Sequence, residues 1–469
     1  MGDAKGFLKT KRRSAGYRAV GERLRDYQEV EARLPQEDVR QQASRCMDCG
    51  VPFCHNACSM ANVIPDFNDL IFRGRWEEAL SVLHATNNFP EFTGRLCPAL
   101  CEAACTLGIN DEPVTIRENE VAIVEWGFGT GMIKPFIPRC RTDRRVAVVG
   151  SGPAGMACGQ QLTRAGHTVT LFEADAMAGG LLRYGIPDFK LEKRVIDRRL
   201  KQLQEEGLVL KTGVRVGADI ASDRLAREYD AICLCVGSRQ PRELAVEGRG
   251  LTGICQALDY LTQSNKRQQG MRIPEAESLV AKDKDVIVIG GGDTGADCVG
   301  TANRQGARSV TQIELLQAPP EVRTKDMPWP TFPKLLKTTS SHQEGCLRLW
   351  GVATKKFSGE AGAVRKLHGV KVDEGFKEIP GSGFELKCDL VILAMGFTHP
   401  AHEGLLKDLG LNLDRFGNIS TNNFSASVPK IFAAGDARRG ASLVVWAIAE
   451  GRGAAREIDR FLMGQTNLP

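Results

Sequence analysis

Long apolar runs, a strong net charge and low-complexity tracts are all missing from this sequence. No uninterrupted apolar stretch reaches the ~18 residues of a membrane span, and the polar N-terminal residues lack the apolar region of a secretory signal. The formal net charge is only +5 over 469 residues, which gives no reason to expect nucleic-acid or membrane partners. These absences favour a cytoplasmic globular protein, and the length is that of two or three domains.

Cysteine, in contrast, is concentrated in one part of the chain. In a reducing compartment such a concentration points to metal or redox chemistry rather than to a disulfide scaffold. Structural zinc is one alternative, because C-x2-C pairs suit tetrahedral sites, and plain burial is another. Iron–sulfur clusters are favoured, since thiolate-rich sites suit them. Seven of the 15 cysteines form the concentration: Cys46, Cys49, Cys54, Cys58, Cys97, Cys101 and Cys105.

Two 4Fe–4S clusters need eight ligands, so seven cysteines are one short. The first four read C-x2-C-x4-C-x3-C, which departs from the bacterial ferredoxin spacing, and Ser59 stands where a proline would follow. On the residues alone, the eighth ligand is either Cys140 or a carboxylate.

Residues 1–140 are expected to form a small, mostly helical domain that holds these two clusters. Proline and glycine interrupt this region often, long strand-like runs are missing, and "WEEALSVLHATNNF" has apolar residues at helical spacing. The stretch "KPFIPRCRTDRR" that follows is typical of a linker.

A glycine-rich turn follows the β-branched run Val146–Val149. Glycines of the pattern G-x-G-x-x-G allow the tight turn, the approach of a pyrophosphate and close packing of the next helix, whose N-terminus attracts the phosphates. Glu173 lies about 20 positions after the first glycine, where a carboxylate accepts from a ribose hydroxyl. We therefore expect a dinucleotide at Gly150, Gly152, Pro153, Ala154, Gly155 and Glu173.

A second turn of the same kind occurs in "DVIVIGGGDTGADC". Glu314 follows at a similar distance, on the strand "VTQIELL", although a strand-end acid is also common as a plain solvated residue. The second set of expected cofactor contacts is Gly290, Gly291, Gly292, Asp293, Thr294, Gly295 and Glu314.

Two such sites in one chain suggest a flavin in one and a nicotinamide in the other, with the protein supplying their orientation. Gly435-Asp436 after "IFAA" is suited to a flavin ribityl and pyrophosphate, and the helix that begins near Val444 would aim its N-terminus at the flavin ring. We therefore expect a discontinuous FAD domain at 143–257 and 396–469, with an NAD(P)H domain at 258–395. The fold class is then a helical iron–sulfur domain followed by two α/β Rossmann-like domains.

Several long stretches resemble one known family. "CMDCGVPFCHNAC", "GGLLRYGIPDFKLEK", "GGGDTGADC" and "AAGDARRGASLVVWAIAEGR" resemble the small (β) subunits of bacterial glutamate synthases, in the same order and over nearly the whole chain. The same module is similar to the N-terminal part of dihydropyrimidine dehydrogenase and to NADH-dependent ferredoxin:NADP oxidoreductases. The resemblance implies a flavoprotein of the adrenodoxin and glutathione reductase type behind the iron–sulfur domain.

The resemblance also implies which residues bind which cofactor. One cluster would take Cys46, Cys49, Cys54 and Cys105, and the other Cys58, Cys97, Cys101 and a non-cysteine ligand. Matching "PVTIRENE" to the related dehydrogenase puts that last ligand at Glu120, which is as easily a plain helix-surface acid. Gly180, Leu181 and Lys190 would line the FAD site.

The resemblance further implies the reaction and the partner. NAD(P)H would reduce FAD, and electrons would pass through the clusters to an FMN-containing large subunit that makes glutamate from glutamine and 2-oxoglutarate. No acid–base constellation is evident, and none is required, because hydride transfer to a flavin depends on placement. The alternatives are a free-standing NAD(P)H:ferredoxin-type oxidoreductase and a non-enzymatic iron–sulfur scaffold.

The strand that ends at Glu314 bears on the choice of nicotinamide. An acid here suits the 2′-hydroxyl of NADH, whereas an arginine suits the 2′-phosphate of NADPH. Leu315 and Leu316 occupy the positions where NADPH-using relatives carry basic residues, which favours NADH. Arg323 and Lys325 lie close enough in sequence to reach a phosphate.

Overall fold

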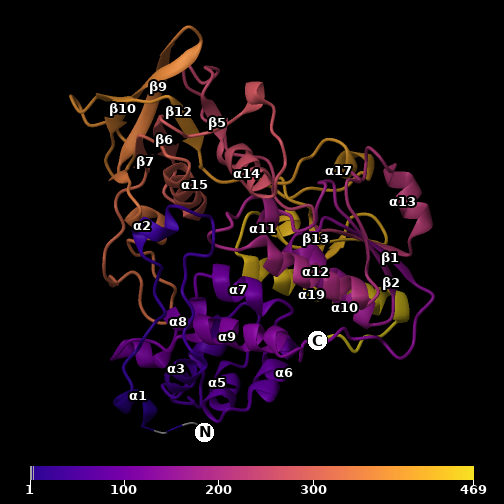
Figure 1. The fold of residues 1–469 in the computed structure, drawn as a ribbon. Coiled ribbons are helices and arrows are strands. Elements are labelled where there is room, and N and C mark those ends of the chain that lie inside the picture. The colour runs from indigo at the N-terminus through magenta and orange to yellow at the C-terminus, as the bar shows by residue number, and fades with distance from the viewer. Residues whose placement is uncertain (1–2, 4) are drawn as a thin grey trace.

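The computed structural model describes Asp3 and residues 5–469. It has a helical N-terminal region and two α/β regions, which lie at the bottom, right and upper left of the view in Figure 1. This arrangement confirms the fold class expected from the sequence. Among the described residues, no helix combines the length and apolar character needed to cross a bilayer.

The helical region contains short helices joined by turns. Its longest helix, α9 (Ile116–Gly129), packs against α7 (Pro90–Leu96) and α6 (Trp76–Thr86). The cysteines lie in or near two short helices, α4 (Phe53–Ala57) and α8 (Leu100–Ala103). The remaining helices are α1 (Gly6–Lys9), α2 (Val20–Arg23), α3 (Gln36–Ala43), α5 (Ile64–Phe72) and the 3-10 turn η1 (Thr106–Ile109).

The first α/β region is built on a seven-stranded sheet whose strands come from two separate segments. Its order is β13-β14-β15-β4-β1-β2-β3, parallel from β15 to β3. The strands are β1 (Arg145–Val149), β2 (Thr168–Phe172), β3 (Val209–Lys211), β4 (Ala231–Leu234), β13 (Thr421–Asn422), β14 (Ser425–Ala426) and β15 (Ile431–Ala433). The helices are α10 (Pro153–Arg164), α11 (Leu181–Tyr184), α12 (Lys193–Glu205), α13 (Ser222–Glu228), α17 (Leu405–Asp408), α18 (Asp436–Arg439) and α19 (Val444–Met463).

The second α/β region has a five-stranded parallel sheet in the order β5-β12-β6-β7-β8, and a three-stranded antiparallel sheet, β11-β10-β9, projects from it (Figure 1). Its strands are β5 (Ile254–Gln256), β6 (Asp285–Ile289), β7 (Ser309–Ile313), β8 (Leu347–Leu349), β9 (Val352–Glu360), β10 (Ala363–Lys371), β11 (Phe384–Lys387) and β12 (Leu390–Leu393). Its helices are α14 (Ala257–Gln268), η2 (Glu275–Glu277), α15 (Asp293–Arg304) and α16 (Ser340–Gln343). Strand β5 pairs with β12, so the second region begins a few residues before the boundary expected after residue 257.

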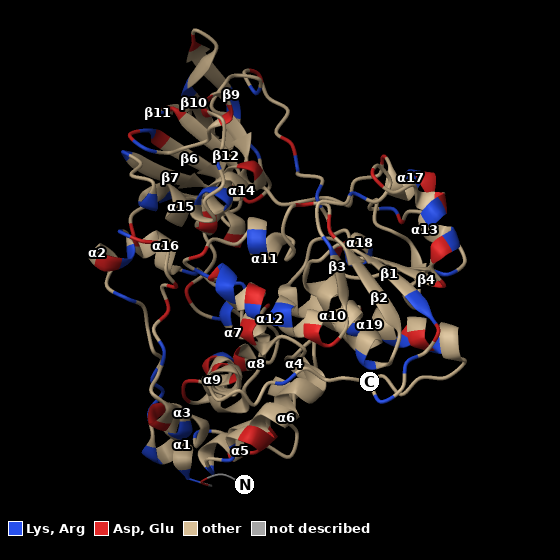
Figure 2. Ribbon diagram, turned by 45° about the vertical axis from the view of Figure 1, so that its right-hand side comes forward, with Lys and Arg blue, Asp and Glu red and all other residues tan. Residues whose placement is uncertain are grey.

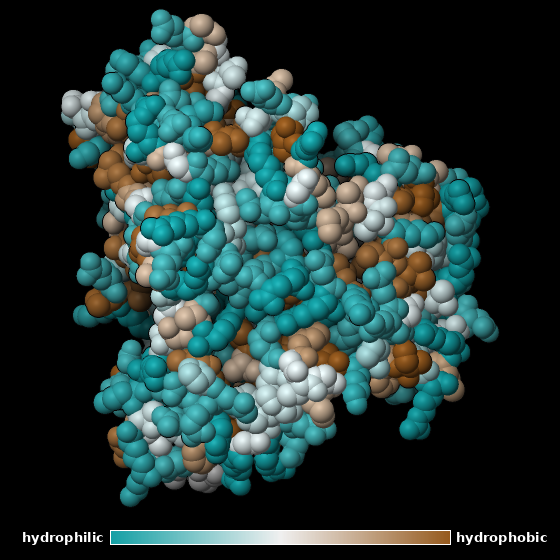
Figure 3. Space-filling model, in the orientation of Figure 1, coloured by the Kyte–Doolittle hydropathy of each residue, from teal (hydrophilic) through white to brown (hydrophobic). Residues whose placement is uncertain are grey.

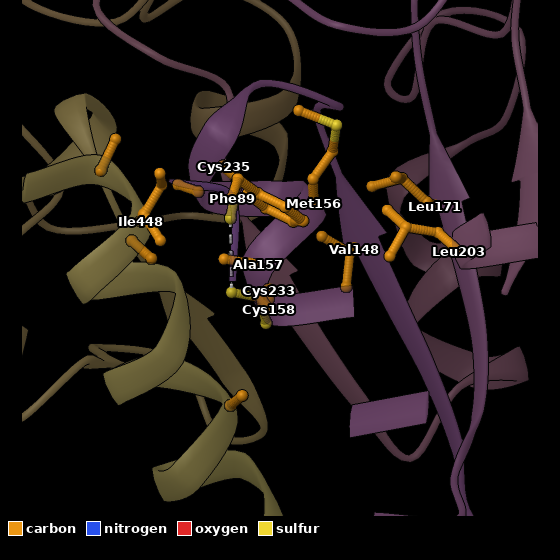
Figure 4. Packing of buried hydrophobic residues seen from close by; sticks show 14 of the residues in the cluster. Phe89, Val148, Met156, Ala157, Cys158, Leu171, Leu203, Cys233, Cys235 and Ile448 are labelled. Carbon is orange, nitrogen blue, oxygen red and sulfur yellow. Dashed lines mark hydrogen bonds between the residues drawn. The ribbon is translucent and has the colours of Figure 1, made fainter. Parts of the chain in front are cut away.

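The helical region and the first α/β region share a hydrophobic core. Phe89 and Phe92, which flank the start of α7, are fully buried in the cluster that also contains Met156 and Ile448. Figure 4 shows Phe89 beside Met156 and Cys235, with Ile448 of α19 on the other side. Cys233 and Cys235 are part of this core, with their sulfurs 3.7 Å apart, as expected of packing cysteines.

The surface is mixed in character. Figure 2 shows Lys and Arg interspersed with Asp and Glu over all three regions. The face in Figure 3 is mostly hydrophilic, with scattered apolar patches. The interspersed charges agree with the small net charge of +5.

Candidate cofactor and metal sites

The first glycine-rich turn joins β1 to α10. Gly150 has φ +102°, and a Cβ there would collide with the Cys235 carbonyl oxygen, so only glycine fits. Gly152 precedes α10, and a Cβ on it would enter open space. The Glu173 carboxylate accepts hydrogen bonds from the backbone N–H groups of Ser151 at 3.1 Å and Asp175 at 2.9 Å. It is thereby fixed beside the turn, with lone pairs left for a ribose hydroxyl.

The second glycine-rich turn repeats this arrangement between β6 and α15. Glu314 directly follows β7, and its carboxylate accepts from the N–H of Gly291 at 2.5 Å and of Leu316 at 3.0 Å. Leu315 and Leu316 are 45% and 58% exposed, respectively. Glu314 is therefore followed by two exposed apolar side chains, whereas Lys325 is solvent-exposed farther along the loop.

A cavity of about 650 Å³ lies where the three regions meet. The structure brings several residues predicted from the sequence to its wall, while the glycines of both turns, Glu173, Thr294 and Glu314 are outside the lining. Thr294 borders a separate cavity of about 90 Å³. The predicted residues on the large cavity are Pro153, Leu181, Lys190, Asp293, Asp436, Val444 and the cysteine Cys97.

Lys190 has a partner that sequence reasoning missed. Its ammonium group forms an ion pair with Asp297 of α15, so the first α/β region is tied to the second across the cavity. Burial opposes the charge on Lys190, but the attraction of Asp297 and Asp293 raises its pKa above the usual value. Burial raises the pKa of Asp297. The signal in the sequence was the spacing: Asp293 and Asp297 are four residues apart and share one helix face.

A further turn, at Gly435-Asp436, borders the same cavity. Asp436 begins α18 and accepts a hydrogen bond from the Ser442 hydroxyl at 2.9 Å. Burial raises the pKa of Asp436 to about 6. The N-terminus of α19 at Val444 faces the cavity, and its unpaired N–H groups favour a negative or electron-rich group there.

The cysteines line two separate cavities. The first is bordered by apolar residues such as Ile64 and Leu107. Burial raises the pKa values of Cys46 and Cys54 to about 12, and a bound metal centre would reverse this preference by stabilising the thiolates. The cysteines of this cavity are Cys46, Cys49, Cys54 and Cys105.

The second cavity contains Cys58, Cys97 and Cys101, and Glu120 borders it too. Glu120 is 5% exposed, and its carboxylate accepts from Asn62 Nδ2 at 2.9 Å and from the Thr93 hydroxyl at 3.4 Å. Burial raises its pKa to about 7. Such a carboxylate, buried beside three thiols, fits a metal centre better than an apolar core.

Two other candidates lie elsewhere. Cys140 is exposed on the linker and does not border either cysteine cavity, so the structure favours a carboxylate over Cys140 as the eighth ligand. Arg323 donates to the carbonyl oxygens of Met327, Thr331 and Ala103, at 2.6 to 3.2 Å, rather than pointing to open solvent near Glu314. In the part of the chain that the structure describes, no group of three or more His, Cys, Asp or Glu could hold a single metal ion.

Comparisons with known proteins identify the families that the two parts of the chain match. Residues 144–451 match the family described as pyridine nucleotide-disulphide oxidoreductase, and residues 23–132 match dihydropyrimidine dehydrogenase domain II, 4Fe-4S cluster. The chain is 51% identical to the glutamate synthase (NADPH) small chain of Mycobacterium tuberculosis H37Rv, over 100% of this chain and 98% of that one.

Two further comparisons bear on the cofactors and the fold. The chain is 45% identical to the glutamate synthase (NADH) of Schizosaccharomyces pombe, over 99% of this chain and 23% of that longer one. The NADPH complex of M. tuberculosis FprA is similar in fold, with a TM-score of 0.56 at 17% identity over 69% of this chain and 85% of that one.

Proposed function

Since the chain belongs to the family of glutamate synthase small chains, an oxidoreductase family, we propose that it feeds reducing equivalents from NAD(P)H to a glutamate synthase large subunit. FAD and two 4Fe–4S clusters would convert hydride chemistry into single-electron transfer, and the large subunit, carrying FMN, would make glutamate from glutamine and 2-oxoglutarate. One observation carries the proposal: Cys97 borders both the large cavity and the second cysteine cavity, so the two redox sites are contiguous.

The first glycine-rich turn and the turn at Gly435 would hold FAD. The open space at Gly152 and the N–H groups at the start of α10 suit a pyrophosphate, and Glu173 suits a ribose. Leu181, Lys190 and Val444 line the cavity where the isoalloxazine would lie. The chain supplies orientation and a cavity that is partly open to solvent, and no proton-transfer group is needed for hydride transfer.

The second glycine-rich turn would bind the nicotinamide nucleotide, and we propose that NADH is preferred. Glu314 would accept from a 2′-hydroxyl, while the exposed Leu315 and Leu316 would offer no charge to a 2′-phosphate. Arg323 donates to three carbonyl oxygens instead. Relatives named for NADPH and for NADH match the chain at 51% and 45% identity, so the names alone do not decide the preference.

Each cysteine cavity would hold one cluster. Cys46, Cys49, Cys54 and Cys105 would ligate the first. Cys58, Cys97, Cys101 and Glu120 would ligate the second, which is the one beside the large cavity. The buried position of Glu120 among three thiols supports its role as the eighth ligand.

The first cluster would then be the exit toward the large subunit. Val51, between Cys49 and Cys54, is 62% exposed, and Ile109, just after Cys105, is 54% exposed. Exposed apolar residues around a redox site suit a protein partner. We assign a cytoplasmic location, and domains at 1–140, 143–257 with 396–469, and 258–395, except that β5 joins the sheet of the last domain. The single sheet shared by the two FAD segments supports this division.

The test is anaerobic purification, iron and sulfide analysis, and reductive titration with each nucleotide. We expect about eight irons per flavin and bleaching by NADH before NADPH. Bleaching by NADPH alone would contradict the assigned role of Glu314, and zinc in place of iron would remove the electron path. Co-purification with the large subunit separates this function from a free-standing ferredoxin-type reductase, and failure of either nucleotide to bleach the protein would favour a non-enzymatic scaffold.

A further inference from the structure

The turn at Gly435 is held from behind by a buried carboxylate. Gly435 has φ +69°, and its N–H donates to Oε2 of Glu450 at 2.9 Å. Glu450 is on α19 and is 5% exposed. Without this acceptor the Gly435 N–H would be buried and unpaired.

The other carboxylate oxygen is used on the same turn. Oε1 of Glu450 accepts from Nη1 of Arg438 at 3.0 Å and from Nη1 of Arg439 at 3.4 Å. Glu450 therefore contacts three positions of the five-residue segment Gly435–Arg439. Charge-assisted bonds of this kind hold geometry more strongly than neutral ones.

The same stretch of α19 also fixes the first glycine-rich turn. The next residue, Gly451, packs so closely on α10 that a Cβ would collide with the Ala154 carbonyl oxygen. A Cβ on Gly435 would come within 2.8 Å of the Ala154 Cβ. The two turns are thus in contact, and Glu450-Gly451 lies behind both.

A shift of the Gly435 turn would move part of the wall of the large cavity. Asp436 follows Gly435 directly and lines this cavity, as does Pro153 at the start of α10. Asp436 and Pro153 therefore depend on the same support from α19 for their relative position.

We propose that Glu450 is a positioning residue for FAD. It acts through Gly435 and the two arginines. These contacts fix the position of the Asp436 turn relative to the first glycine-rich turn, so that both turns can hold one cofactor. The inference depends on the proposed function in one respect, namely that FAD occupies the large cavity.

The test compares three full-length variants. Glu450→Leu removes all three contacts. Glu450→Gln keeps an oxygen for the Gly435 N–H but loses the charge that pairs with the two arginines. Glu457→Gln is the matched control, because Glu457 lies on the same helix and, among the described residues, its carboxylate pairs only with Arg460. The readouts are the FAD content after purification, the Kd of FAD for protein stripped of flavin, the Tm of the stripped protein, and the absorption spectrum of bound FAD.

We expect Glu450→Leu to raise the Kd of FAD roughly thirtyfold, as for loss of a buried, charge-assisted bond. Glu450→Gln should raise it about fivefold, and Glu457→Gln should match the wild type. An altered flavin spectrum in both Glu450 variants would support positioning, since a purely structural residue would lower the Tm and leave the bound spectrum unchanged.

Two results would overturn the inference. One is a wild-type Kd and spectrum in Glu450→Leu. If Glu450→Leu does not fold, a wild-type Kd in Glu450→Gln would be equally decisive. If the wild type and Glu457→Gln also fail to take up FAD, the proposed function itself fails, and that result is distinct from a defect confined to the Glu450 variants.

Discussion

Arg23 of α2 donates from Nε to Oε1 of Glu344 at 2.7 Å, and the two side chains are 1% and 0% exposed. Arg304 donates to both oxygens of the same carboxylate, from Nη1 to Oε2 at 2.5 Å and from Nη2 to Oε1 at 3.0 Å. An N-terminal helix is thereby anchored to the second α/β region, far from it in sequence.

Replacing Arg23 tests this anchor. We expect Arg23→Met to lower the free energy of unfolding by about 3 kcal/mol, because breaking a buried pair leaves Glu344 with half its partners. Denaturant unfolding measures the loss. Arg227→Met is the control, since its pair with Asp223 is exposed and worth ~0.5 kcal/mol or less. Equal losses in the two variants would contradict a structural role for the anchor.

The eighth cluster ligand is tested through iron content. Glu120→Ala should remove one cluster, leaving about four irons per chain instead of eight, with the spectroscopic signal of one cluster retained. Glu118→Ala, two residues earlier on α9, is the control, because Glu118 borders a different cavity. Retention of all the iron in Glu120→Ala would show that another group supplies the ligand.

Nucleotide preference is tested at the end of β7. Glu314→Ala should lower kcat/KM for NADH about tenfold, and Leu315→Arg should raise kcat/KM for NADPH, because an arginine there can pair with the 2′-phosphate.

Arg323→Ala is the contrasting variant. Its donors are directed to carbonyl oxygens, so the ratio of the two kcat/KM values should stay as in the wild type. A selective loss of NADPH activity in Arg323→Ala would show that this arginine binds the phosphate after all.

The lowered pKa of His342 leads us to expect that the free energy of unfolding depends on pH. Burial and the nearby Arg348 lower its pKa to about 4, from an ordinary value of 6.5. Its Nδ1 accepts from the Thr339 N–H at 3.2 Å, so protonation would break this bond. The unfolded chain binds the proton more readily, and stability is therefore complete above pH 6.5 and falls as the pH drops toward 4.

Melting temperatures between pH 7 and pH 4.5 check this dependence. The decline should be shallower in His342→Gln, which has no ring to protonate. An identical decline in the wild type and in His342→Gln would assign the acid sensitivity to other groups.

The sequence predicted most reliably what depends on neighbouring residues. The turns at Gly150 and Gly290 and the acids Glu173 and Glu314 follow from a strand–turn–helix pattern within about 30 residues. Contacts between distant segments have no comparable pattern in the sequence. Nothing near Glu450 indicates that it accepts from Gly435, and nothing near Arg323 indicates that it donates to Ala103.

The cysteines fall between these two cases. Their density predicted metal centres, but their division into two sets came from resemblance to a family, because Cys105 joins Cys46 across more than 50 residues of intervening chain. Glu120 also could be predicted as a ligand only from the resemblance to a family, since a single acid in a helical stretch is usually a surface residue.

The placement of Phe89 has a consequence for how the chain can be divided. The linker before β1 is a boundary in sequence only, because Met60, Phe89 and Phe92 complete a core whose other buried residues lie beyond it. Cutting the chain there would give two fragments with exposed apolar faces, prone to aggregate. We therefore expect residues 1–140 and the first α/β region to melt as one cooperative unit, so that disrupting the packing around the cysteines lowers the melting temperature of both.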